Sequence, residues 1–353
     1  MQLGFFDLDN RYAQLSKLND PLEGLNRIID WNLFADLLAE TTTKPRKSAA
    51  GRKPFDRVML FKMLVLQRMN NLPDDRLEYQ VRDRLSFMRF LGLDLAGVVP
   101  DAKTMWAFRE ELKENHLMER LFARFDDCLR ELDVELKSGQ IIDATFVTVP
   151  KQRNRREENE MIKEGAVPVE WGKDPRKLAQ KDIEARWTKK NNESFYGYKD
   201  HVNVDRDTKL ITAWEVTSAE VHDSQVLEEV LQSPEEGGAD VYADSAYRSD
   251  AQEESLIASK HTSQIHEKGA RNHPLTEAQK SSNKEKSRVR ARVEHVFGSM
   301  TNELSGITIR TIGRARAKVQ IGLLNLVYNI NRVAMLIRKG HFSFDRVIAP
   351  EMA

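Results

Sequence analysis

The sequence predicts an α/β fold with a mixed sheet and flanking helices, preceded by an all-helical region. Up to about residue 137 the apolar residues recur at helical spacing, whereas runs rich in β-branched residues begin at residue 138. Three such runs come first, and helical and strand patterns then alternate, which is typical of α/β layers. We therefore divide the 353 residues into a helical domain (1–137), an α/β domain (138–340) and a C-terminal tail (341–353).

The helical domain has a clear start signal at Asp20 and Pro21, a capping residue followed by proline at the first helical position. Short helices joined by tight turns suit a helix-turn-helix DNA-binding module and also a plain helical bundle, which the pattern alone favours. Further helices are predicted over residues 56–70, 74–91, 104–113 and 116–136.

The α/β domain opens with the strand pattern IIDATFVTVP. Residues 151–192 are long, polar and mixed in charge, and we expect an exposed insertion that is partly helical at best. FYGYKDHVNVD and KLITAWEVTSA, separated by a turn, then predict a hairpin. The remaining elements are predicted as helices over 223–231, 277–300 and 314–339, a helix after 249, and strands at 239–243 and 263–266.

The charge is balanced, with 55 basic and 55 acidic residues, which argues against a protein coated in basic surface. Its distribution is uneven and leaves nucleic-acid binding open. Residues 44–53 hold five basic and no acidic residues, and residues 284–318 hold nine basic and three acidic ones. Residues 213–243 hold eight acidic and no basic residues, so we expect them to lie away from DNA.

The chain's location is predicted to be cytoplasmic, because no signal peptide is visible. The most apolar segment, 321–336, is interrupted by polar residues and reads as a buried helix, so no membrane partner is expected. The one cysteine, Cys128, cannot form an intramolecular disulfide or a cysteine-based zinc site, and we interpret it as a packing thiol.

Three carboxylates stand out as candidate metal ligands. Asp143 lies inside an apolar strand, where an acid is costly unless it binds something. Asp244 follows a predicted buried strand, at the position where α/β sheets bind ligands. Glu294 lies beside the apolar stripe of a predicted helix. Carboxylates gathered from two strands and a helix can hold two Mg²⁺ ions for phosphoryl transfer.

Simpler interpretations of the same residues stay open at this point. Asp244 could cap the next helix, and a turn could satisfy Asp143. Arg290 and Glu294 are four residues apart and could form an ordinary surface ion pair.

The motifs IIDATFVTVP, FYGYKDHVNVD, VTSAEVHDS, YADSAYRS and RVRARVEHVFG, in this order, resemble DDE transposases of the IS-five insertion-sequence family. The resemblance extends over residues 51–336 and implies a ribonuclease-H-like catalytic domain. It also implies that Asp143, Asp244 and Glu294 are the metal-binding and catalytic triad. Two Mg²⁺ ions are the implied cofactor, and Mn²⁺ is a possible substitute.

The resemblance further implies that Arg290 is the signature arginine that positions DNA. Related transposases often carry a tyrosine three residues before this arginine and a lysine seven after the glutamate, where this chain has Ser287 and Thr301. Lys284 and Lys286 are candidate substitutes. The residues predicted to contact DNA are Arg290, Arg288, Arg292, Lys284, Lys286, Arg248, Tyr247 and Lys199.

Other residues allow two interpretations. His222 could lie beside the active site or cap a helix. Trp171 and Trp187 could stack on bases or anchor the insertion.

We therefore expect a bacterial transposase that binds the terminal inverted repeats of its element, cleaves the strands and joins the 3′-hydroxyls to target DNA. The expected partners are double-stranded DNA, at the transposon ends and the target, and a second copy of the chain. The protein is expected to associate with the nucleoid. A non-catalytic DNA-binding regulator derived from a transposase is the alternative, followed by a nuclease without strand joining.

Overall fold

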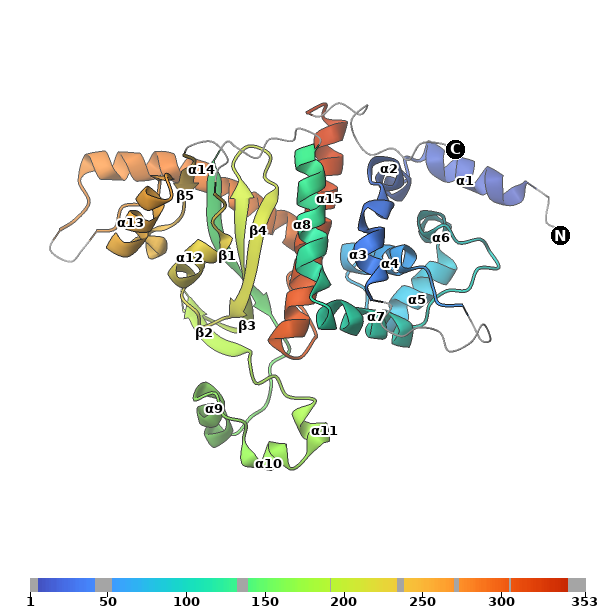
Figure 1. Ribbon diagram of the computed structural model, residues 1–353, viewed down its shortest axis with the longest axis horizontal. Helices are drawn as coiled ribbons and strands as arrows, with labels where there is room; N and C mark the ends of the chain where they lie inside the picture. The colour runs from blue at the N-terminus through green and yellow to red at the C-terminus, as the bar shows by residue number, and fades with distance from the viewer. Residues whose placement is uncertain are drawn as a thin grey trace. The chain divides into compact units, whose positions relative to one another are not determined.

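The structure is a computed structural model, and its elements are drawn in Figure 1. The contacts divide the chain into two compact units, residues 1–134 with 326–353 and residues 135–325. The domain boundaries expected at 137 and 340 stay a prediction. Most of the basic segment 44–53 and of the tail 341–353 lies outside the described residues, as does part of the acidic stretch 213–243. The structure describes residues 6–41, 53–131, 139–190, 192–233, 238–269, 273–304 and 306–341.

The first unit is helical, as predicted. Helix α2 begins where expected, because the Asp20 carboxylate accepts a hydrogen bond from the Leu22 N–H at 3.0 Å. The single helix expected over 74–91 is wrong, because Arg84 has extended backbone angles and separates two helices. The elements are α1 (Asp7–Lys17), α2 (Pro21–Ile28), η1 (Trp31–Phe34), α3 (Ala35–Ala39), α4 (Arg57–Met69), α5 (Asp74–Asp83), α6 (Leu85–Leu91), α7 (Ala102–Glu114) and α8 (Leu117–Glu131).

The second unit is built on one mixed sheet. Strand β1 pairs antiparallel with β3, and β3 pairs antiparallel with β2 and β4. On its other side β1 pairs parallel with β5, which pairs parallel with β6. The strands are β1 (Gln140–Thr148), β2 (Arg186–Lys190), β3 (Glu193–Asp205), β4 (Ile211–Ser218), β5 (Asp240–Tyr242) and β6 (Thr262–Ser263).

The strand order confirms the predicted fold class. Three antiparallel strands, β1, β3 and β4, are followed by β5 and β6, which extend the sheet from the free side of β1. This mixed sheet with its flanking helices is ribonuclease-H-like. The helical elements around it are η2 (Asp223–Val226), α12 (Leu227–Val230), η3 (Ser245–Tyr247), α13 (Asp250–Ala258), α14 (Glu277–Asn302) and α15 (Arg314–Arg338).

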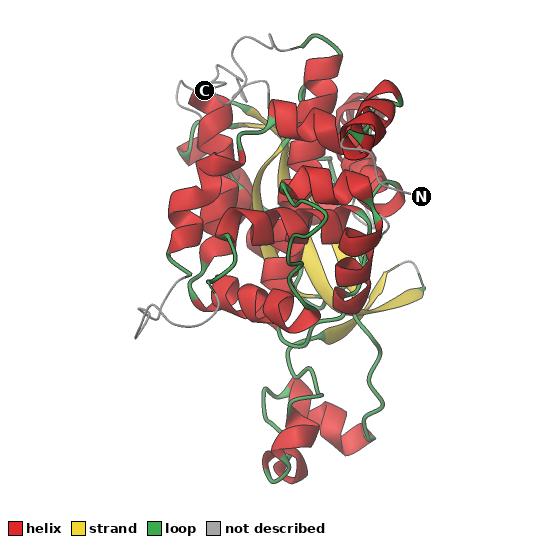
Figure 2. Cartoon of the chain, turned by 90° about the vertical axis from the view of Figure 1, so that its right-hand side faces the viewer, coloured by secondary structure: helices red, strands yellow, loops and turns green. Residues whose placement is uncertain are grey.

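The polar insertion lies between β1 and β3 in the chain. It contains three short helices, α9 (Arg156–Lys163), α10 (Val169–Gly172) and α11 (Pro175–Leu178), which two loops join to the sheet (Figure 2). Near its end, Arg186–Lys190 form strand β2 on β3, and the expected end of the insertion at about residue 192 stays a prediction. Trp171 is fully buried, and its ring N–H donates to Glu158 at 2.7 Å. Trp171 therefore holds parts of the insertion together, and its ring has no exposed face on which a DNA base could stack.

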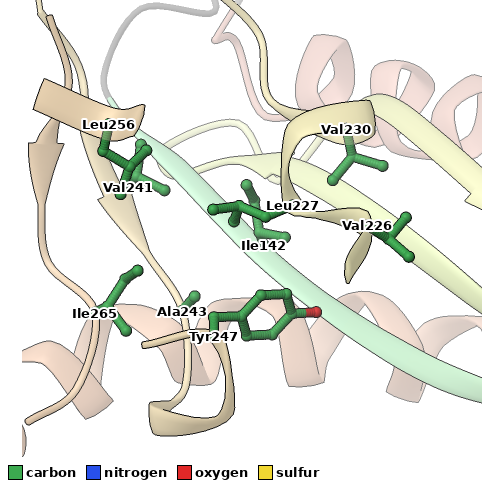
Figure 3. Packing of buried hydrophobic residues seen from close by; sticks show 9 residues of the cluster. All are labelled: Ile142, Val226, Leu227, Val230, Val241, Ala243, Tyr247, Leu256 and Ile265. Atoms are coloured by element: carbon green, nitrogen blue, oxygen red, sulfur yellow. The ribbon is translucent and has the colours of Figure 1, made fainter. Parts of the chain in front are cut away.

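Apolar side chains cover both faces of the sheet, because alternate residues of a strand point to opposite sides. Ile142 of β1 belongs to the cluster in Figure 3, with side chains from α12, β5 and η3. Val147, an odd number of residues along the same strand, packs on the other face with Ala317 and Ile321 of α15. Helices therefore pack on both faces of the sheet. The polar residues of the sheet are the candidates for a functional site.

The predicted buried C-terminal helix is confirmed, since residues 321–330 of α15 are all buried. None of the helices in the described parts of the chain is long and apolar enough to cross a lipid bilayer.

Candidate active site

Asp143 lies near the middle of β1, directly after two fully buried isoleucines, Ile141 and Ile142. Its side chain is 13% exposed, and its Oδ1 accepts a hydrogen bond from the Ala144 N–H at 2.8 Å. Burial raises the pKa of Asp143, which the charge of Arg290 opposes and the nearby charge of Asp244 reinforces. A carboxylate in this position favours a cation beside it.

Asp244 lies next to Asp143 because of the strand register. In the parallel pair of β1 and β5, Ile141 is opposite Tyr242, and each acid follows its strand partner by two residues. Neighbouring strands are about 4.8 Å apart, so the two carboxylates reach one region. Asp244 also caps η3, its Oδ1 accepting from the Ala246 N–H at 2.6 Å. The capping interpretation is therefore confirmed. Asp244 caps η3 and also lies close to Asp143.

Helix α14 carries the third acid, Glu294, across this part of the sheet. The helix packs on β1 and β5 and buries Val293 and Val296. Glu294 itself is 62% exposed at the side chain. The surface ion pair with Arg290 is confirmed, with Arg290 Nη2 3.3 Å from Glu294 Oε1.

Arg290 joins two of the three acids. Its Nη1 donates to Asp143 Oδ2 at 2.6 Å while its Nη2 faces Glu294. The guanidinium thus lies between a strand carboxylate and a helix carboxylate that are 151 residues apart (294 − 143). Among the described residues, no three histidine, cysteine or acidic side chains converge closely enough to hold a metal ion.

The three acids nevertheless fit a hard divalent cation chemically. They offer only oxygen donors, which Mg²⁺ and Mn²⁺ accept. One of them, Asp143, is buried, and its charge is compensated in this structure by a cationic group. A metal ion at the same place would supply that compensation instead.

The predicted basic residues of α14 form two rows at four-residue spacing. Lys286 and Arg290 continue to Glu294, and the Lys286 ammonium donates to the Ile265 carbonyl at 3.0 Å. In the other row Lys284 and Arg288 are exposed. Arg292 ends that row and contacts the Arg206 carbonyl and, at 3.0 Å, the Asp207 carboxylate.

Two of the residues predicted to contact DNA, Tyr247 and Lys199, are buried. Tyr247 is 1% exposed and belongs to the apolar cluster of Figure 3, so its ring meets protein and not a phosphate. Lys199 is 8% exposed, and its ammonium is 2.7 Å from Asp223. Both side chains have a structural role in this arrangement.

The Arg248 side chain is 30% exposed, donates to the Ile265 carbonyl and pairs with Glu267 at 3.1 Å, so its contact with DNA stays a prediction. His222 caps η2, its Nδ1 accepting from the Ser224 N–H at 3.3 Å, which confirms the capping interpretation for this histidine.

His266 belongs to the site although the sequence pattern gave no sign of it. Its backbone N–H donates to the carbonyl of Ala243, the residue before Asp244, at 3.2 Å. Burial and the charge of Arg290 lower its pKa, while Asp244 raises it. Its Nε2 lies 3.3 Å from the Ser287 hydroxyl. Its only distinction in the sequence is its place at the end of the strand predicted over 263–266, at the edge where α/β sheets bind ligands, and that place alone does not single it out.

Comparison with known proteins gives two family matches. A family model described as a transposase DDE domain matches residues 135–330, more than half of the chain. A second, described as a transposase domain, matches residues 9–111. A solved structure titled as the cryo-EM structure of piggyBac transposase synaptic complex with hairpin DNA is similar at a TM-score of 0.47 and 13% identity. The similarity covers 91% of this chain and 76% of that chain.

Proposed function

The chain belongs to the family of transposases with a DDE domain, and from that premise we propose that it cleaves and joins DNA at the ends of its own insertion sequence. The finer assignment to the IS-five family is part of this proposal. So are the binding of terminal inverted repeats, the hydrolysis of strands at those ends and the transfer of 3′-hydroxyls to target DNA.

The observation that carries the proposal is the convergence of two acids across the parallel strands, with a third reached through Arg290. Asp143, Asp244 and Glu294 would hold divalent metal, whose use is general among DDE transposases. Two such ions, Mg²⁺ or Mn²⁺, would supply activation of a water or 3′-hydroxyl and stabilisation of the leaving oxygen when bound. No covalent link between protein and DNA is then needed.

The chain's own cations would hold the DNA. Lys284 and Arg288 are exposed on α14 and can meet phosphates directly. Arg290 is next to the acids and can orient the strand that is cut. Lys286 and Arg292 reach backbone carbonyls, which fixes α14 on the sheet and leaves part of each charge for DNA.

The helical unit would bind the transposon ends, in keeping with the second family match. We also propose that two copies of the chain act together, because one transposition event pairs two ends. A location at the nucleoid follows from the DNA substrate.

The test separates cleavage from binding. Purified wild-type protein and Asp244→Ala are incubated with a labelled duplex that ends in the element's inverted repeat. We expect wild-type protein to cut the duplex in Mg²⁺. The variant should lose cutting while its affinity, measured by fluorescence anisotropy in EDTA, stays within about threefold, because its phosphate-contacting cations are intact. Cutting by the variant at the wild-type rate would contradict the triad.

A further inference from the structure

We propose that Arg290 competes with the divalent cation for Asp143 and Glu294, so that metal and DNA bind cooperatively. The inference rests on the proposed function, because it takes DNA as the ligand that draws the arginine away. It goes beyond that function by assigning to Arg290 the control of when the divalent cation can bind, namely after DNA has drawn the arginine away.

The first step is that guanidinium and metal need the same atoms. Arg290 Nη1 is 2.6 Å from Asp143 Oδ2, and Nη2 is 3.3 Å from Glu294 Oε1. A divalent cation binds such oxygens at about 2.0–2.6 Å. A guanidinium and a divalent ion cannot both lie at these distances from one oxygen pair, because the two like charges would repel each other at contact.

The second step is that Arg290 has an unsatisfied donor. Its Nε–H is buried and has no hydrogen-bond partner among the described residues, although both terminal nitrogens are engaged. A buried N–H without an acceptor is unfavourable. A phosphate could accept from Nε and Nη2 together, the bidentate contact that arginine forms with this group. DNA thus offers Arg290 an alternative contact that also engages its Nε–H.

The third step is access. The Arg290 side chain is 23% exposed and Glu294 is 62% exposed, so the outer side of the ion pair is open to a ligand. The exposed Lys284 and Arg288 of the same helix can bring a phosphate backbone there. Movement of the guanidinium toward that backbone frees Oδ2 of the buried Asp143 for the cation.

The consequence is a thermodynamic linkage. DNA must tighten metal binding, and metal must tighten DNA binding by the same factor. Couplings of this kind are typically about 5–150-fold. In the absence of DNA, the wild-type protein should bind a divalent cation weakly.

The direct test measures cation binding and not cleavage. Free Mn²⁺ is followed by electron paramagnetic resonance in titrations of wild-type protein, Arg290→Gln and Arg292→Gln without DNA. Arg292 is the matched control, because it is an arginine of the same helix that pairs with Asp207 and not with the acids. We expect Arg290→Gln to bind Mn²⁺ about 5–150-fold more tightly than wild type. Arg292→Gln should stay near the wild-type value.

A result in which Arg290→Gln binds no more tightly than Arg292→Gln would overturn the inference. Thermal unfolding of both variants shows whether they are folded. A second measurement uses wild-type protein, so that the test does not depend on the folding of the two arginine variants. The affinity of wild-type protein for an inverted-repeat duplex is measured by anisotropy with and without Ca²⁺. It should rise with Ca²⁺, and the rise should vanish in Asp244→Asn.

The outcomes also separate this inference from the proposed function. If wild-type protein cuts inverted-repeat ends but Ca²⁺ leaves its DNA affinity unchanged, only the competition by Arg290 is wrong. If the chain neither cuts nor binds these ends, the proposed function is wrong and the inference falls with it.

Discussion

At the scale of single residues, the polar groups buried around the sheet differ in whether they have a partner. The Tyr198 hydroxyl donates to both oxygens of Asp182, at 2.9 and 2.8 Å. The equally buried Tyr247 hydroxyl has no partner among the described residues. Removing a hydroxyl that has no partner loses little, whereas removing a donor from a buried carboxylate costs that carboxylate a charge-assisted hydrogen bond.

The two tyrosines therefore give a matched pair of substitutions. Tyr247→Phe should leave the free energy of unfolding unchanged or raise it, within about 1 kcal/mol. Tyr198→Phe should lower it by about 1–3 kcal/mol, because the buried Asp182 loses one of its donors and keeps, among the described residues, only backbone N–H groups. Urea unfolding of both variants measures this. Equal decreases in the free energy of unfolding would show that the Tyr247 hydroxyl forms a hydrogen bond as stabilising as that of Tyr198.

A second residue-scale prediction concerns pH. Asp200 is fully buried on β3, and this burial raises its pKa to about 8, although the Asn325 amide donates to it at 3.1 Å. From about pH 4 to about pH 8 the unfolded chain has lost this proton and the folded chain keeps it. Asp200 therefore makes the free energy of unfolding fall as pH rises, by at most about 1.4 kcal/mol per pH unit.

The measurement compares wild type with Asp200→Asn by urea unfolding between pH 5.5 and 8. The comparison is needed because burial lowers the pKa of His201 to about 4, which acts in the opposite sense below pH 6.5. The fall with pH should be smaller in the variant. Parallel curves would mean that Asp200 is ionised throughout this range in the folded protein.

Sequence reasoning reached some site residues and missed others for identifiable reasons. Asp143 and Asp244 could be found because an acid within or after an apolar strand is conspicuous on its own. His266 could not, because its closeness to Asp244 depends on the pairing of β5 with β6, a two-residue strand. Tyr247 was misjudged, since nothing in YADSAYRS says which way its ring turns.

At the scale of elements, long periodic segments were predictable and local breaks were not. Helices α4 and α15 lie close to their expected bounds because each is apolar at helical spacing over most of its length. Helix α14 does so although only its second half, residues 289–300, has an apolar stripe, and a capping box at Thr276 and Gln279 marks its start. Strand β2 was missed because its sequence, RWTKK, is mostly charged, as befits a half-exposed strand. The break at Arg84 has no glycine or proline signal.

One close approach between elements gives an element-scale prediction. Gly197 of β3 has a φ of +147°, and a Cβ there would lie 2.2 Å from the Val147 carbonyl oxygen of β1. Gly197→Ala must therefore push β1 and β3 apart, and should lower the free energy of unfolding by about 1–3 kcal/mol or more. Gly172→Ala is the control, since a Cβ at Gly172 meets nothing within 4 Å.

Thermal and urea unfolding of the two alanine variants check this expectation. The control should be neutral or stabilised by up to about 1 kcal/mol, because alanine restricts the unfolded chain. Equal stabilities for both variants would contradict the close packing of the strand that carries Asp143.

At the scale of the whole molecule, the two family matches correspond to different parts of the chain. The match described as a transposase domain covers residues 9–111, and the DDE match covers residues 135–330. All three proposed metal ligands lie in the second. Sequence order alone could suggest this division, because the β-branched pattern begins near residue 138.

Catalysis by Asp143, Asp244 and Glu294 can be tested with the whole chain on its own DNA. A supercoiled donor plasmid carries the gene with its native flanking sequence, and breaks are mapped at nucleotide resolution in Mg²⁺. Wild-type protein is compared with Glu294→Gln and with Glu285→Gln, an exposed glutamate of the same helix. We predict breaks at the inverted-repeat ends with wild type and Glu285→Gln, and none with Glu294→Gln.

Breaks by Glu294→Gln at the wild-type level would contradict the metal-binding triad. End binding by wild-type protein without breaks, in Mg²⁺ and in Mn²⁺, would contradict catalysis and identify a DNA-binding regulator on a transposase scaffold.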